Sequence, residues 1–146
     1  MRIAKPALEA IQVHGSEGYP NEICGIMLGP RGEGRVTEVR RARNIVGLPE
    51  SHWTFTSDRT RDRYEMDPAD QIRVQREADE SGLDIVGYYH SHPDHPAQAS
   101  KFDADQAWAG YVYLIVAVEK GSPVAANAFV AVQDHGPFRP EPLEPA

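Results

Sequence analysis

The sequence contains a single cysteine, Cys24, among its 146 residues. One thiol excludes an internal disulfide and every zinc site that is built on two or more thiolates. Six histidines are present, so a metal ion in this chain would have to be bound by histidine and carboxylate side chains.

The sequence also lacks an excess of positive charge. Its 15 lysines and arginines are outnumbered by 22 aspartates and glutamates, which gives a formal net charge of −7. This balance argues against nucleic-acid partners and anionic membranes, which require a basic surface. Long hydrophobic runs are missing as well, and the first residues do not resemble a signal peptide. We therefore expect a cytoplasmic protein that does not cross a membrane.

The length predicts one domain. We place this domain at residues 1–135. The last residues, 136–146, include Pro137, Pro140, Pro142 and Pro145, and we expect them to form a mobile C-terminal tail.

Hydrophobic periodicity and turn residues predict alternating helices and strands. Asp67 and Pro68 begin one helix as its cap and first residue, and Gly82 ends it. The expected elements are a helix up to about residue 17, strands over 23–28, 36–46 and 52–56, a helix over 68–81, a strand over 83–91, a helix from 100 to about 109, and strands over 111–118 and 125–132. A single-domain α/β (α+β) fold, with a mixed sheet flanked by helices, would bury their apolar faces.

The clearest chemical pattern is His90-Ser91-His92-Pro93 at the end of the strand predicted over 83–91. Side chains two residues apart in a strand point to the same face of the sheet. The two imidazoles can therefore converge on one metal ion.

Ser100 and Asp103 follow in the spacing of a capping box, which places Asp103 in the first turn of a helix. If the loop of about ten residues folds this turn back over the histidines, two imidazoles and one carboxylate leave a tetrahedral metal with one open position. An open position is typical of catalytic zinc. Such a site also needs a proton acceptor, and Glu22 is a candidate, although spacing alone does not bring it near His90.

These residues together resemble the signature of the JAMM (or MPN) metalloprotease family: a glutamate before an apolar strand, then His-x-His-Pro, seven residues, and Ser-x-x-Asp. Glu22 precedes Ile23-Cys24-Gly25-Ile26-Met27-Leu28, and the remaining positions are His90, His92, Ser100 and Asp103. The resemblance is to the compact bacterial branch and covers about residues 1–133. One departure is Ala99, where family members usually have proline before the serine.

The resemblance implies a JAMM/MPN (cytidine-deaminase-like) architecture and one zinc ion per chain, bound by His90, His92 and Asp103. It implies that Glu22 is the general base for the attacking water and then the acid for the leaving amine. It also implies that Ser100 stabilises the oxyanion. A serine at this position can equally cap the helix, and the sequence leaves both roles open.

The function implied is hydrolysis of a peptide or isopeptide bond after the C-terminal Gly-Gly of a ubiquitin-like or sulfur-carrier protein, releasing cysteine or a lysine-linked partner. Residues 47–66 and a sheet edge are the expected determinants of substrate choice. Two alternatives remain at this point: a non-catalytic MPN scaffold that binds a partner, and a zinc hydrolase of a small-molecule amide. The sequence does not give the oligomeric state.

Other residues have plainer interpretations. We expect His95 to lie near the site without binding the metal, and Cys24 to be a buried apolar residue. We expect His14, His52 and His135 to be structural or exposed. The basic stretch from Arg40 to Arg43 is typical of a solvated surface, with contact to an acidic partner as the alternative.

Overall fold

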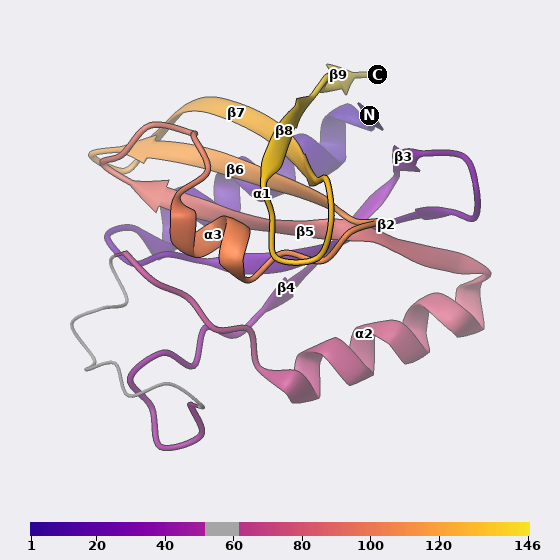
Figure 1. Cartoon of the computed structure of the whole chain (residues 1–146), viewed down its shortest axis with the longest axis horizontal. Helices are drawn as coiled ribbons and strands as arrows, with labels where there is room; N and C mark the ends of the chain where they lie inside the picture. The colour runs from indigo at the N-terminus through magenta and orange to yellow at the C-terminus, as the bar shows by residue number, and fades with distance from the viewer. Residues whose placement is uncertain (52–61) are drawn as a thin grey trace.

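Six strands form one curved, mixed β-sheet in the computed structural model, which describes residues 1–51 and 62–146 (Figure 1). The strands are, in spatial order, β4 (Glu38–Ala42), β2 (Cys24–Pro30), β5 (Leu83–Pro93), β6 (Val112–Glu119), β7 (Ser122–Ala131) and β8 (Phe138–Glu141). Neighbouring strands are antiparallel except β5 and β6, which are parallel. The fold class predicted from the sequence is confirmed.

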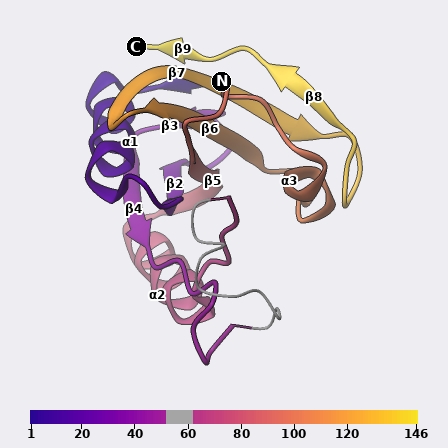
Figure 2. The ribbon, with the colours of Figure 1, turned by 90° about the vertical axis from the view of Figure 1, so that its left-hand side faces the viewer.

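Helices cover both faces of this sheet. In β2, Met27 packs in the cluster that contains Ala7 and Ile11 of α1 (Lys5–Gly18), whereas Ile26 packs with Val74 of α2 (Pro68–Ser81). This division follows from the alternation of side chains along a strand. Figure 2 shows α1 on one side of the sheet and the short helix α3 (Lys101–Asp105) on the other.

The α2 helix begins and ends where the sequence predicts. The Asp67 side chain accepts a hydrogen bond from the Ala69 amide at 2.9 Å, and Gly82 closes the helix with a φ of 69°. Glycine adopts that left-handed conformation at the least cost of any residue.

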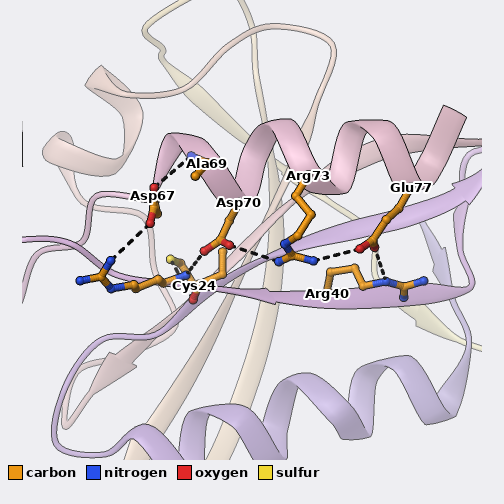
Figure 3. Close-up of polar contacts among 9 residues, drawn as sticks. Cys24, Arg40, Asp67, Ala69, Asp70, Arg73 and Glu77 are labelled. Carbon is orange, nitrogen blue, oxygen red and sulfur yellow. Dashed lines mark hydrogen bonds and ion pairs between the residues drawn. The ribbon is translucent and has the colours of Figure 1, made fainter. Parts of the chain in front are cut away.

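Ion pairs and one backbone bond join α2 to β4 and the residues after it (Figure 3). The carboxylate of Asp70 accepts from the backbone amide of Arg43 at 2.8 Å. The other contacts form a row along the helix surface through Asp70, Arg73, Glu77, Arg40 and Glu38. These charges are partly exposed to solvent, so each ion pair contributes little to the free energy of unfolding and the row mainly orients the helix.

The strand predicted over 36–46 is divided in the structure. Val36 belongs to β3 (Arg35–Val36), which joins a small parallel sheet with β1 (Arg2–Ile3) and β9 (Glu144–Pro145), while β4 pairs with β2. The amide of Thr37, between β3 and β4, donates to the carbonyl of Leu28 at 2.9 Å. The strand predicted over 52–56 lies outside the described residues.

The C-terminal residues 136–146, for which the sequence predicts a mobile tail, form strands instead. β8 pairs with β7, and the β9 residue Glu144 donates its amide to the carbonyl of Met1 at 2.9 Å. Prolines are tolerated here because β8 lies at an edge of the sheet, where a missing N–H breaks no ladder. The domain boundary at residue 135 stays a prediction. No helix among the described residues is long and apolar enough to span a membrane.

Gly87 permits the close parallel pairing of β5 with β6. A Cβ atom built at Gly87 would lie 1.8 Å from the carbonyl oxygen of Val112. Because that neighbour is backbone and cannot rotate away, the Gly87→Ala variant should be destabilised by about 1–3 kcal/mol. Urea unfolding followed by circular dichroism measures the change.

A glycine in open space is the control for this prediction. Gly34 has a φ of 62°, and no atom lies within 4 Å of the position that a Cβ would occupy. Asparagine tolerates this conformation, so Gly34→Asn should lose less than about 1 kcal/mol. Equal losses in the two variants would contradict the steric argument.

Candidate metal centre and active site

His90 and His92 lie at the carboxyl end of β5 and point to the same face of the sheet. Their Nε2 atoms are 3.2 Å apart, and both residues are buried. The strand presents Tyr89 and Ser91 to the other face, as the period of two requires. The convergence of the two imidazoles that the sequence predicts is therefore present.

The carboxylate of Asp103 completes a triangle with these nitrogens. Its Oδ1 lies 3.2 Å from His90 Nε2, and its Oδ2 lies 3.2 Å from His92 Nε2. The backbone amide of Ser100 also donates to Oδ2 at 2.9 Å. Burial disfavours the charged form of Asp103, but the histidines and this amide outweigh burial and hold its pKa well below the usual range.

The triangle fits a tetrahedral metal ion. Ligand atoms about 2.0–2.1 Å from a zinc ion in tetrahedral geometry are separated from each other by about 3.3–3.4 Å. The two imidazole nitrogens are 3.2 Å apart, and each lies 3.2 Å from a different oxygen of the Asp103 carboxylate, so each of these contacts is close to that value. Two imidazole nitrogens and one carboxylate oxygen are also a donor set that zinc accepts.

Hydrogen bonding and burial favour the form of these imidazoles that binds a metal through Nε2. His92 Nδ1 lies 2.9 Å from the carbonyl oxygen of Pro96, so Nδ1 carries the hydrogen and Nε2 keeps its lone pair. Burial lowers the pKa of His90 and keeps its ring neutral. The ring of Tyr64 stacks on His90, with centroids 4.6 Å apart.

Glu22 lies in the same cluster, just before β2. Ligand atoms of Glu22, His90 and His92 all lie within 4.8 Å of one another, so the Glu22 carboxyl group can reach either a metal ion held by the imidazoles or a water molecule bound to that ion. Burial, and then the charge of Asp103, raises the pKa of Glu22 to about 9. A nearby cation favours the carboxylate, so a bound metal would lower this pKa towards neutrality.

Ser100 acts as a helix cap in this structure. Its hydroxyl oxygen accepts from the Asp103 amide at 3.0 Å, and the Asp103 carboxylate accepts from the Ser100 amide, which together form the predicted capping box. The helix α3 is shorter than expected and ends at Asp105. The cap positions Asp103 on the histidines, so the structural role of Ser100 serves the site directly.

The remaining histidines and the cysteine follow their plainer interpretations where the structure describes them. His95 is exposed and is not part of the metal-binding cluster found among the described residues. His14 Nδ1 bonds to the hydroxyl of Tyr89, and Cys24 is fully buried. His135 Nδ1 bonds to the carbonyl of Asp105. His52 lies outside the described residues.

Burial raises the pKa of the Cys24 thiol, with Glu22 and Asp70 adding to the effect. A thiol in this state is a poor nucleophile.

The basic stretch from Arg40 to Arg43 is engaged in ion pairs. Arg40 contacts Glu38 and Glu77, and Arg41 contacts Glu17. Arg43 lies 3.0 Å from Glu50. These contacts fit the solvated surface that the sequence favours.

Two residues of the site are not part of the sequence pattern: Tyr64, which covers His90, and Asn44, which bonds to the backbone of Glu22 at 3.1 Å. Neither belongs to a spaced motif, and they reach the site from two segments that are 20 residues apart in the chain. An isolated bridge between Asn44 and Met66 brings these two segments together.

Comparisons with known proteins agree with this geometry. A family described as prokaryotic homologues of the JAB domain matches residues 4–131. A desampylase from Haloferax volcanii is 32% identical over 120 residues, which are 79% of this chain and 78% of that protein. A CysO-cysteine peptidase from Mycobacterium tuberculosis is 29% identical over 101 residues, covering 68% of this chain and 60% of that protein.

Solved structures share the fold. A protein from Salinibacter ruber has a TM-score of 0.73 at 36% identity and covers 100% of this chain and 92% of its own. A JAB1/MPN domain protein from Archaeoglobus fulgidus has a TM-score of 0.60 at 16% identity, covering 100% and 97% of the two chains.

We expect zinc binding to depend on the His92 imidazole and not on the His95 imidazole. His92→Ala should lose zinc, with affinity falling by more than about 100-fold, because the carboxylate and His90 cannot replace the missing donor. Competition with a chromophoric chelator, together with elemental analysis, measures the loss. His95→Ala, in the same loop, is the matched control and should keep one zinc per chain. Retention of zinc by His92→Ala would show that the ligand assignment is wrong.

Proposed function

Because the chain belongs to the prokaryotic JAB domain family, we propose that it is a zinc-dependent peptidase that cleaves after the C-terminal Gly-Gly of a ubiquitin-like or sulfur-carrier protein. The single observation that carries this proposal is the triangle of His90, His92 and Asp103 with Glu22 beside it. Relatives named desampylase and CysO-cysteine peptidase support the choice of substrate.

His90, His92 and Asp103 would bind one zinc ion per chain. The ion would act as a Lewis acid and lower the pKa of water to about 7. Asp103 contributes a negative charge because its pKa is well below the usual range, and histidine binds a metal ion as the neutral imidazole. The ligand set therefore leaves a net positive charge, which suits a centre that stabilises a developing oxyanion.

Glu22 is the proton carrier of this proposal. Its carboxylate takes the proton from the attacking water and then delivers it to the nitrogen of the leaving amine, so that one residue serves as base and then acid. The burial that raises its pKa to about 9 without a cation favours this role, because a proton carrier is most effective when its pKa lies near the operating pH.

A cavity of about 640 Å³ beside the site offers a place for the substrate segment that precedes the bond. Tyr64 lines this cavity and stacks on His90, so the cavity borders the metal-binding residues. Aromatic side chains dominate its wall: Tyr64, Tyr88, Trp108, Tyr111 and Tyr113. Apolar side chains of an extended tail would be buried there, while the terminal glycines carry no side chain that could clash beside the metal-binding residues.

A Glu22→Gln variant distinguishes an enzyme from a scaffold. The amide keeps the shape of the side chain but cannot accept the proton, so turnover should fall by at least about 100-fold while zinc binding and folding are retained. The assay uses a sulfur carrier extended by one cysteine and a carrier joined through its Gly-Gly to lysine.

Two other results would replace the proposal. If the wild type and Glu22→Gln bind a carrier protein equally well and neither cleaves it, the result would favour a scaffold. Cleavage of small amides, but of neither carrier, would favour a small-molecule hydrolase.

The cavity makes a separate prediction. Trp108 is 51% exposed at its wall, and Trp108→Ala should raise KM for a carrier substrate about 10-fold with little change in kcat, because a buried aromatic anchor is worth more than about 1 kcal/mol. Val132→Ala, which removes an exposed apolar side chain that does not line this cavity, is the control. A fall in kcat alone would contradict a binding role.

A further inference from the structure

The peptide bond between Glu22 and Ile23 is held at both of its polar atoms by side chains. Its N–H, on Ile23, donates to Ser91 Oγ at 2.9 Å, and its C=O, on Glu22, accepts from Asn44 Nδ2 at 3.1 Å. The two side chains come from different segments of the chain. We propose that Ser91 and Asn44 are positioning residues that clamp this peptide and thereby hold the Glu22 carboxylate in place for proton transfer.

The geometry of a peptide explains why a clamp at this bond matters. The Cα of Glu22 lies in the plane of the peptide that Glu22 shares with Ile23, because the bond has partial double-bond character. Fixing the C=O and the N–H fixes that plane, and with it the position from which the Glu22 side chain extends. Glu22 precedes β2, where the regular ladder has not begun, so the ladder alone does not supply this constraint.

Ser91 is the residue between the two histidines and faces away from them. It is fully buried, and its backbone N–H also donates to the carbonyl of Ile23 at 3.1 Å. The hydroxyl of Ser91 thus accepts the hydrogen bond from the Ile23 amide. In a regular ladder a backbone carbonyl of the neighbouring strand would accept that bond. The strand that presents His90 and His92 to one face uses its opposite face to hold the base, so the distance between base and ligands is set by one short segment.

Asn44 uses all of its hydrogen-bonding capacity. Its Nδ2 donates to the carbonyls of Glu22 and Arg63, at 3.1 and 3.2 Å. Its Oδ1 accepts from the amides of Val46 and Glu65, both at 3.1 Å. An asparagine amide offers two donors and two acceptor lone pairs, so this side chain is saturated. Asn44 therefore links Glu22 to the segment 63–65, whose Tyr64 covers His90.

The clamp is composed of neutral groups. Neither Ser91 nor Asn44 titrates near neutral pH, and neither is among the residues placed to bind the metal. Their loss should therefore leave zinc binding intact and act on the proton-transfer step alone. This expectation rests on the proposed function, because it assigns that step to Glu22.

The experiment compares the zinc-loaded wild type with Ser91→Ala, Asn44→Ala and the double variant. Each single variant should lower kcat about 10- to 100-fold, the cost of a misplaced catalytic group, with KM within about twofold and one zinc per chain. Because release of either end frees the peptide, the double variant should be no more than about threefold slower than the slower single variant. Asn44→Asp, which keeps both accepted bonds and loses the donated ones, should resemble Asn44→Ala.

A second measurement does not depend on turnover. Amide hydrogen exchange at Ile23, followed by NMR in the zinc-loaded protein, should accelerate at least about 10-fold in Ser91→Ala and also in Asn44→Ala. Val74→Ala, in the separate core cluster that α2 forms with β2, is a control for general loss of stability and should leave kcat and the Ile23 exchange unchanged.

The outcomes separate the clamp from the proposed function. Unchanged kcat with faster exchange overturns the positioning role, and so does a fall in kcat that accompanies zinc loss. Fully additive effects in the double variant overturn the shared peptide. If the zinc-loaded wild type cleaves no carrier, the proposed function fails; the clamp is then supported when both variants release the Ile23 amide and overturned when neither does.

Discussion

The double engagement of the Asp103 carboxylate is the constraint on which the rest of the site depends. One of its oxygens accepts from the Ser100 amide while both face imidazole nitrogens. The Asp103 carboxylate therefore belongs to the capping box of a five-residue helix and also lies against the two imidazoles at the centre of the site. A helix this short has little stability of its own, so the capping box and the histidine contacts hold it, and in return it carries the carboxylate to β5.

Buried charged groups destabilise the folded state unless an opposite charge compensates for the loss of hydration. Asp103, Glu22 and His90 are all less than 10% exposed, and the described residues place both carboxyl groups close to the same imidazoles. Both carboxyl groups cannot easily be charged at once in this buried space. The pKa of Asp103 is held low, and the pKa of Glu22 is raised to about 9 by burial and by the charge of Asp103. A divalent cation bound here would offset both carboxylates at once. The protonation of Glu22 and the occupancy of the proposed metal site would therefore be coupled.

The elements that the sequence predicts well are those with local signals. Asp67, Pro68 and Gly82 mark α2, and the spacing of Ser100 and Asp103 marks the capping box. His90 and His92 converge because a strand has a period of two. Contacts between distant segments could not be predicted in this way. Asn44 is 22 residues from Glu22 in the chain and reaches it because β4 pairs with β2, and Tyr64 reaches His90 from a loop.

The C-terminal strands are a second case in which local sequence does not predict the structure. Prolines at 137, 140, 142 and 145 indicate an irregular tail, because proline removes a donor from a ladder. At an edge that removal is harmless, and which strand lies at an edge is a property of the whole sheet. The local sequence thus shows that each proline lacks an N–H donor. It does not show whether a neighbouring strand would need that donor.

The order of the sheet explains why site residues from distant positions in the chain can be held so closely. β5 lies between β2 and β6 in the centre of the sheet, so its carboxyl end is fixed on both sides. Glu22 enters from β2, and Asp103 enters from the connection between β5 and β6. A parallel pair requires such a crossover, and here the crossover contains the capping box. The topology that obliges the chain to leave the sheet after His92 therefore also returns Asp103 to it.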